Sequence, residues 1–170
     1  MPMKHLHDKS QTGFTLLEVM ISIVIFSIGM LGLAGLQATS IQSNNIAYMR
    51  TIAMQSAYDM ADIIRANANF NNTVDGAFSN VTTTLGSEPT ACQSDGTPDC
   101  DSSEIAAFEI YYWKSNLSDL LPSGRGTVSL APGTYTITVM WDQDRTGATG
   151  EDCGTDSSVD LKCYTLQARI

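Results

Sequence analysis

The most apolar part of the chain lies near its N-terminus, between a short polar segment and a long polar remainder. Residues 19–36 are 18 consecutive residues without a charged side chain, most of them Ile, Leu, Val, Met or Gly. About 20 apolar residues are needed for a helix to cross the hydrocarbon core of a bilayer, roughly 30 Å thick. The pattern therefore predicts a transmembrane segment over residues 14–36.

The same helix is expected to continue beyond the membrane. No Gly or Pro occurs between Leu36 and Asp75. Apolar residues recur near helical spacing in this stretch, namely Ile41, Tyr48, Met49, Ile52, Ala53, Met60, Ile63 and Ile64. The spacing predicts one helix from Phe14 to about Ala68, roughly 80 Å long at 1.5 Å per residue. Its second half, residues 37–68, is amphipathic and is expected to pack on a globular head.

Residues 69–170 have the pattern of that head. Turn-forming residues dominate 69–86, which predicts a surface loop with one short strand. Acidic residues follow an N-cap at Asp101 or Ser102, and apolar residues then recur every three to four positions, which predicts an amphipathic helix ending near Pro122.

Three later stretches, residues 127–130, 134–141 and 161–169, alternate or are rich in β-branched and aromatic residues, and Pro132-Gly133 supplies the first turn. The expected fold class is α+β: a long N-terminal helix packed on a small antiparallel sheet of three strands or slightly more, with one extra helix. Trp113 and Trp141 are expected in its core.

Charge and composition then exclude several functions. The chain has 170 residues, 43% of them hydrophobic, and a net charge of −9 with nine Lys and Arg, which speaks against a nucleic-acid-binding surface. The histidines, His5 and His7, both precede the apolar segment, so histidine-based catalysis and metal binding are not expected after it.

Other catalytic and cofactor signatures are also missing. The sequence contains no Gly-x-Ser-x-Gly motif and no phosphate-binding loop, so we expect no enzyme, no cofactor and no metal, and no nucleic-acid or small-molecule ligand is indicated. The acidic run that begins at Asp142 is like a calcium loop, but its twelfth position is Cys153 rather than a bidentate glutamate. A solvated hairpin loop is expected there.

The charges beside the apolar segment predict its orientation. Lys4 and Lys9 precede it, and the next basic residue is Arg50. By the positive-inside rule, the N-terminus is expected in the cytoplasm and the rest of the chain is expected to be exported.

The four cysteines, Cys92, Cys100, Cys153 and Cys163, all lie in the part that we expect to be exported, where disulfides form. Three pairings are possible. We favour Cys92 with Cys100 and Cys153 with Cys163, because each pair brackets a short polar loop, while the connectivity stays open. Zinc is disfavoured because no two cysteines have the close spacing of tetrahedral sites.

Glu18 is unusual, because a carboxylate one turn into a membrane helix costs about 2 to 3 kcal/mol unless it finds a partner. The stretch Gly13-Phe14-Thr15-Leu16-Leu17-Glu18, after a short basic leader and before an apolar helix, resembles the prepilin signature of type IV pilins and type II secretion pseudopilins.

The resemblance implies specific processing. A prepilin peptidase would cut between Gly13 and Phe14 on the cytoplasmic side and methylate the new Phe14 amine. Removal of the leader, residues 1–13, would leave 157 of the 170 residues. In this family the glutamate at the position of Glu18 is thought to pair with the N-terminal amine of a neighbouring subunit, and two charges in a low-dielectric bundle attract strongly.

Small residues on the apolar segment fit contact with neighbouring helices. Gly29, Gly32 and Gly35 are three apart, and small residues let helices approach closely. The resemblance to pilins implies three partners, which are other pilins, the prepilin peptidase and the inner membrane.

Residues 101–142 also resemble minor pilins of the PilV type, more loosely. This favours a minor type IV pilin that contributes to pilus assembly or a tip complex, and so to adhesion and twitching motility at the cell surface. Two alternatives stay open: a minor pseudopilin of a type II secretion system, and a membrane-anchored binding module that does not polymerise.

Overall fold

The computed structural model describes residues 13–68, 76–89 and 100–170. The chain divides after Asn44 into two compact units, residues 1–44 and 45–170, and helix α1 contributes to both. The elements in chain order are α1 (Leu16–Ala68), β1 (Asn80–Val81), α2 (Ser102–Leu120), β2 (Arg125–Ala131), β3 (Thr134–Trp141) and β4 (Lys162–Ala168).

The strands form one antiparallel sheet in the order β1-β2-β3-β4, so sequence neighbours are also spatial neighbours. Strands β2 and β3 make a hairpin in which Ala131 pairs with Thr134 across the predicted Pro132-Gly133 turn. Gly133 has a φ of 70°, a backbone conformation that side chains disfavour and glycine adopts freely.

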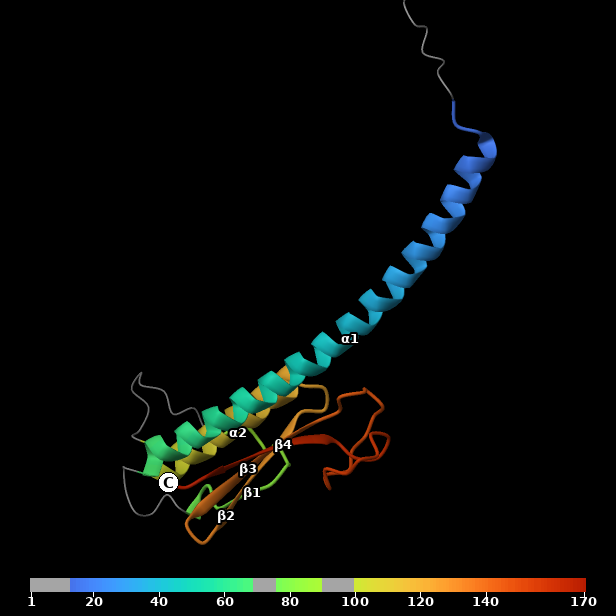
Figure 1. Ribbon diagram of the computed structural model, residues 1–170. Coiled ribbons are helices and arrows are strands. Elements are labelled where there is room, and N and C mark those ends of the chain that lie inside the picture. The colour runs from blue at the N-terminus through green and yellow to red at the C-terminus, as the bar shows by residue number, and fades with distance from the viewer. Residues whose placement is uncertain (1–12, 69–75, 90–99) are drawn as a thin grey trace, which may run out of the picture. The chain divides into compact units, whose positions relative to one another are not determined.

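In the second unit, α2 and residues 45–68 of α1 lie side by side over one face of the sheet (Figure 1). Alternate residues of β3 supply most of the sheet's part of the core, namely Tyr135, Ile137, Val139 and Trp141, and the other strands add Val81, Val128 and Ala168. From α1 come Met49, Ala53, Ala57, Met60, Ala61 and Ile64. The fold class expected from the sequence is therefore confirmed.

Two glycines let α2 approach the start of β2. A Cβ added at Gly126 would lie 2.2 Å from Cη2 of Trp113, and one at Gly124 would lie 2.0 Å from the carbonyl oxygen of Leu117. No side chain fits at either place, so close packing of this helix on this strand depends on glycine.

Helix α2 begins at a capping box. The Asp101 carboxylate accepts hydrogen bonds from the backbone N–H groups of Ser103 and Glu104, and the Glu104 carboxylate accepts one from the N–H of Asp101. The N-cap predicted from the sequence is thus confirmed at Asp101.

Some predicted positions differ in the structure. Of the apolar positions predicted on the long helix, Ile41 and Tyr48 are 70% and 60% exposed, whereas Met49 and Ala53 are buried. The helical spacing near the end of α2 allowed either Leu120 or Leu121 in the core, and the structure buries Leu121 and exposes Leu120. The predicted surface loop contributes Phe78, which is fully buried in the core.

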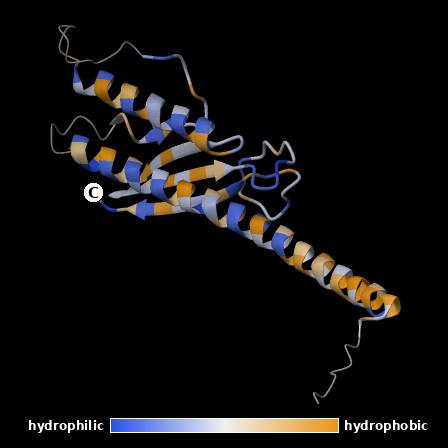
Figure 2. Ribbon diagram, turned by 90° about the horizontal axis from the view of Figure 1, so that it is seen from above, coloured by the Kyte–Doolittle hydropathy of each residue, from blue (hydrophilic) through white to orange (hydrophobic). Residues whose placement is uncertain are grey.

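The first unit contains residues 16–44 of α1, and the described residues there are exposed on all sides within the chain. Orange, apolar positions surround this part of the helix, whereas the part of α1 in the second unit alternates in colour (Figure 2). A helix that is apolar all round is stable only where another apolar environment surrounds it.

Candidate processing and assembly site

The predicted cleavage bond lies in accessible, non-helical backbone. Gly13, Phe14 and Thr15 precede the first turn of α1, and Phe14 is 85% exposed. A Cβ added at Gly13 would meet no atom within 4 Å. A protease needs backbone that is free of regular structure, and this bond has that property.

Thr15 forms the start of the helix. Its carbonyl oxygen accepts hydrogen bonds from the N–H groups of Glu18 and Val19, and its Oγ1 lies 3.3 Å from the N–H of Glu18. A threonine hydroxyl that accepts from the third residue onward is a typical N-cap. The helix start is therefore defined by residues of the prepilin-like stretch itself.

Glu18 lies in the first turn of α1, where the positive end of the helix dipole favours a carboxylate. Its side chain is exposed, and neither of the two ion pairs found among the described residues includes it. One turn later, the hydroxyl of Ser22 donates to the Glu18 carbonyl oxygen. The carboxylate is thus held on a rigid helix with its own charge unpaired within the described chain.

The three predicted packing glycines, Gly29, Gly32 and Gly35, are exposed on the same helix. A Cβ added at any of them would meet no atom within 4 Å. The single chain therefore gives these glycines no internal packing role, and their use in helix contacts remains a prediction.

Among the described residues, α1 is the helix long and apolar enough to cross a membrane, and its apolar window has none of its surface buried inside the chain. Large apolar side chains line this window without any internal partner. Together with the residues before it, this helix indicates membrane anchoring.

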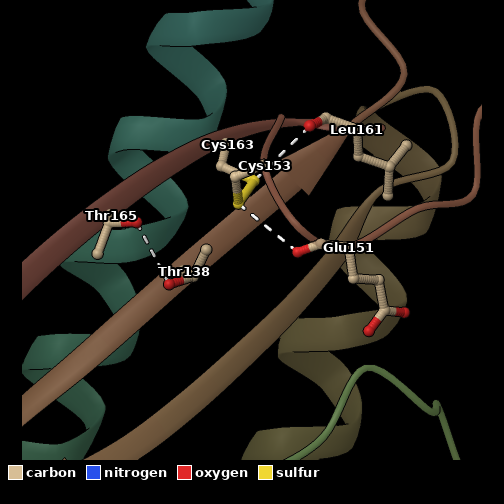
Figure 3. Close-up of a disulfide and its surroundings, with 6 residues drawn as sticks. All are labelled: Thr138, Glu151, Cys153, Leu161, Cys163 and Thr165. Carbon is tan, nitrogen blue, oxygen red and sulfur yellow. Dashed lines mark hydrogen bonds between the residues drawn. A yellow bond between two sulfur atoms is a disulfide. The ribbon is translucent and has the colours of Figure 1, made fainter. Parts of the chain in front are cut away.

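A disulfide closes the loop between β3 and β4. Cys153 and Cys163 are joined, and Cys163 belongs to β4 (Figure 3). This is one of the two pairs that the sequence favours. Cys100 is also disulfide-bonded; its favoured partner, Cys92, lies outside the described residues.

The same loop is anchored at Asp142 rather than fully solvated. The buried Asp142 carboxylate accepts hydrogen bonds from the N–H groups of Thr146 (3.1 Å) and Gly147 (2.8 Å). Burial by itself raises the pKa of Asp142, but these hydrogen bonds outweigh it and leave the pKa below its usual value. The carboxylate therefore organises the turn.

No cluster of metal-ligating side chains occurs in the ranges that the structure describes. Glu151, which follows the acidic run, is paired with Arg125 of β2 at 3.0 Å.

Sequence reasoning missed Lys114. This residue lies on the buried side of α2, beside Trp113, with its ammonium against the backbone of residue 84. Its spacing of four residues from Ile110 and three from Leu117 was a signal in the helical periodicity, but the predicted apolar stripe passed over it.

Residues 8–34 match the family model of the prokaryotic N-terminal methylation motif. The matched stretch contains the predicted cleavage bond, Glu18, Gly29 and Gly32. Comparison with curated proteins and with solved structures found no match.

The motif match supports a protein that resembles type IV pilins and pseudopilins. The motif also implies processing by a prepilin peptidase and assembly with other pilins.

Proposed function

We propose that this chain is a minor type IV pilin, which enters the pilus in few copies and contributes to its assembly or tip complex. Adhesion and twitching motility would then depend on it. Its role is structural, and no catalysis or cofactor is involved.

One observation carries the proposal. The Gly13-Phe14 bond lies in exposed backbone immediately before a helix whose first turn holds Glu18 and whose next 18 residues are uncharged and exposed. An ordinary membrane anchor needs neither a cleavage bond on this side of its apolar segment nor a carboxylate at its start, where the charge is costly in lipid.

Glu18 supplies the specific contact between subunits. Cleavage before Phe14 creates a cationic amine at the N-terminus of the mature chain, at the start of the segment that carries Glu18. A neighbouring subunit's amine can pair with the Glu18 carboxylate, and leaving either charge unpaired in an apolar bundle is expensive. Pairing would therefore set the axial register of the subunits.

The remaining features support the location. Lys4 and Lys9 support a cytoplasmic leader by the positive-inside rule. The disulfide between Cys153 and Cys163 fits a head in an oxidising compartment, first the periplasm and then the filament surface. The looser resemblance of residues 101–142 to minor pilins of the PilV type favours the pilus over a secretion pseudopilus.

The test is the intact mass of the protein from native membranes and from sheared surface filaments. We expect a species that begins at Phe14 and carries one added methyl group, and we expect it in the filaments as well as the membrane. An unprocessed chain that begins at Met1 would contradict the proposal and leave an ordinary anchored domain.

Deletion of the gene separates the two filament systems. A minor pilin predicts loss of piliation or twitching with secretion intact. A processed protein that is absent from sheared pili, together with normal motility and failed secretion, would instead identify a pseudopilin.

A further inference from the structure

A cavity of about 290 Å³ opens at the surface of the second unit, between α2 and the extended segment that follows β1. Ala107, Ile110, Tyr111 and Lys114 line it from α2, and residues 80–82 and 84–87 line the opposite wall. Its volume is at the lower end of small-molecule sites, roughly 300 to 1,000 Å³. The space fits a ligand about as large as one amino acid.

Lys114 supplies the cavity's charge. The residue is only 8% exposed, and its Nζ donates a hydrogen bond of 2.7 Å to the carbonyl oxygen of Thr84. An ammonium group has three N–H donors, so this bond satisfies one of them. Neither ion pair among the described residues includes Lys114.

A cation in that position is costly. Burial lowers the pKa of Lys114, because removal of the ammonium from water disfavours its charged form. A buried charge is normally compensated by an opposite charge or a full set of hydrogen bonds. The described residues give Lys114 one carbonyl, and the cavity is the space next to it from which a further acceptor can come.

The other residues that line the cavity indicate what the rest of a ligand would contact. Ile110, Leu85 and Tyr111 give the cavity apolar surface, and Thr82 and Ser87 are polar lining residues able to orient a ligand. A single lysine provides one positive charge and no bidentate fork, so it matches a monoanion better than a phosphate dianion.

We propose that this cavity binds a small organic carboxylate, whose anionic group lies on Nζ of Lys114 and whose apolar body lies against Tyr111 and Ile110. The site would be present whether or not the chain enters a filament, so its test is independent of the assembly role. Thr84 would stay bonded to Lys114 and would hold the ammonium in place for the ligand.

The experiment uses the full chain, with its disulfides formed, in nanodiscs of zwitterionic lipid. The probes are 3-phenylpropionate and its uncharged isostere 3-phenylpropionamide, and binding is measured by saturation-transfer NMR titration. Empty nanodiscs correct for partition of the probes into lipid. We expect the carboxylate to bind at least about tenfold more tightly than the amide, because only the carboxylate makes a charge-assisted hydrogen bond to the ammonium.

Two substitutions locate the effect. Lys114→Met keeps the length of the side chain and removes the charge, and it should abolish the preference for the carboxylate. Lys162→Met removes a lysine of β4 that does not line the cavity and should keep the preference. Near-UV circular dichroism checks that each variant is folded.

The wild-type comparison does not depend on either variant. Equal affinities for the two probes, or no saturable carboxylate binding below about 10 mM, would overturn the proposal. Lys114 would then serve only to fasten the segment around Thr84 to α2. A preference that survives in Lys114→Met would overturn it as well, because the anion would then bind elsewhere.

Discussion

The indole Nε1 of Trp113 donates a hydrogen bond of 2.8 Å to the backbone carbonyl oxygen of Ser56. This bond joins α2 to α1 between residues 57 positions apart in sequence, and both residues are buried. Tryptophan has one polar atom on a large apolar ring, so a single side chain here both fills the core and fixes how the two helices meet.

Substitution Trp113→Phe should lower the free energy of unfolding by about 2 kcal/mol, from the lost hydrogen bond and the smaller ring. Trp141→Phe is the matched control, because Trp141 is equally buried and its Nε1 has no partner among the described residues. The control should cost about 1 kcal/mol less, since no hydrogen bond is broken. Urea unfolding followed by near-UV circular dichroism measures both, and equal losses would show that the Ser56 bond contributes nothing.

Substitution Gly126→Ala should destabilise the head by about 1 to 3 kcal/mol, because the added Cβ would overlap the Trp113 ring and overpacking is costly. Gly76→Ala is the control, since a Cβ there meets no atom within 4 Å. Thermal unfolding of the two variants gives the comparison. An unchanged midpoint for Gly126→Ala would mean that α2 moves away from β2 at no cost.

Removal of the Cys153–Cys163 bridge by the double substitution to serine should cost about 2 to 3 kcal/mol, as expected for a loop that spans 10 positions. Hydrogen exchange should show the loss as weaker protection of β4, which contains Cys163. If protection falls equally in α2 and β4, the bridge stabilises the unit as a whole.

The turn at Asp142 should make the head sensitive to acid. A carboxyl group whose pKa is lower in the folded state than in the unfolded one contributes stability above its unfolded pKa, and that contribution is lost as the pH falls through the folded pKa. Asp142→Asn should therefore reduce stability at pH 7 and flatten its decline below about pH 4. Unfolding midpoints at pH 7, 4 and 2.5 test this, and a variant curve parallel to the wild type would contradict it.

Substitution Glu18→Ala should leave the amount of protein in the membrane unchanged and reduce its amount in sheared filaments several-fold, because the proposed partner of the neighbouring amine is lost. Ser22→Ala, one turn further along α1, removes a polar group without changing charge and should assemble normally. Immunoblots of membrane and filament fractions measure both. Wild-type filament levels for Glu18→Ala would refute the pairing.

Local signals made much of the fold predictable from the sequence. The stretch without Gly or Pro, the N-cap at Asp101 and the Pro132-Gly133 turn each act over a few residues, and α1, α2 and the β2–β3 hairpin follow them closely. The prepilin-like stretch, residues 13–18, was equally recognisable, because its residues are contiguous and lie within the matched N-terminal methylation motif.

Contacts between distant segments were not predictable in the same way. Phe78 lies in a stretch dominated by turn formers, and only the sheet and the two helices around it make it a core residue. The burial of Lys114 depends on the carbonyl of Thr84, 30 positions away. Position 126 requires glycine because the Trp113 ring of α2 lies against it. The sequence of β2 alone does not indicate this contact.

The bridge between Cys153 and Cys163 makes completion of the fold depend on the redox state of the compartment. Thiols stay separate in a reducing compartment, so a newly made chain has no covalent loop there and can be drawn through a narrow channel as a single strand. Oxidation afterwards links β4 covalently to the loop before it and stabilises the folded head against unfolding. If the head is exported as we propose, it is completed only after delivery, and a copy retained on the reducing side would remain open to proteolysis.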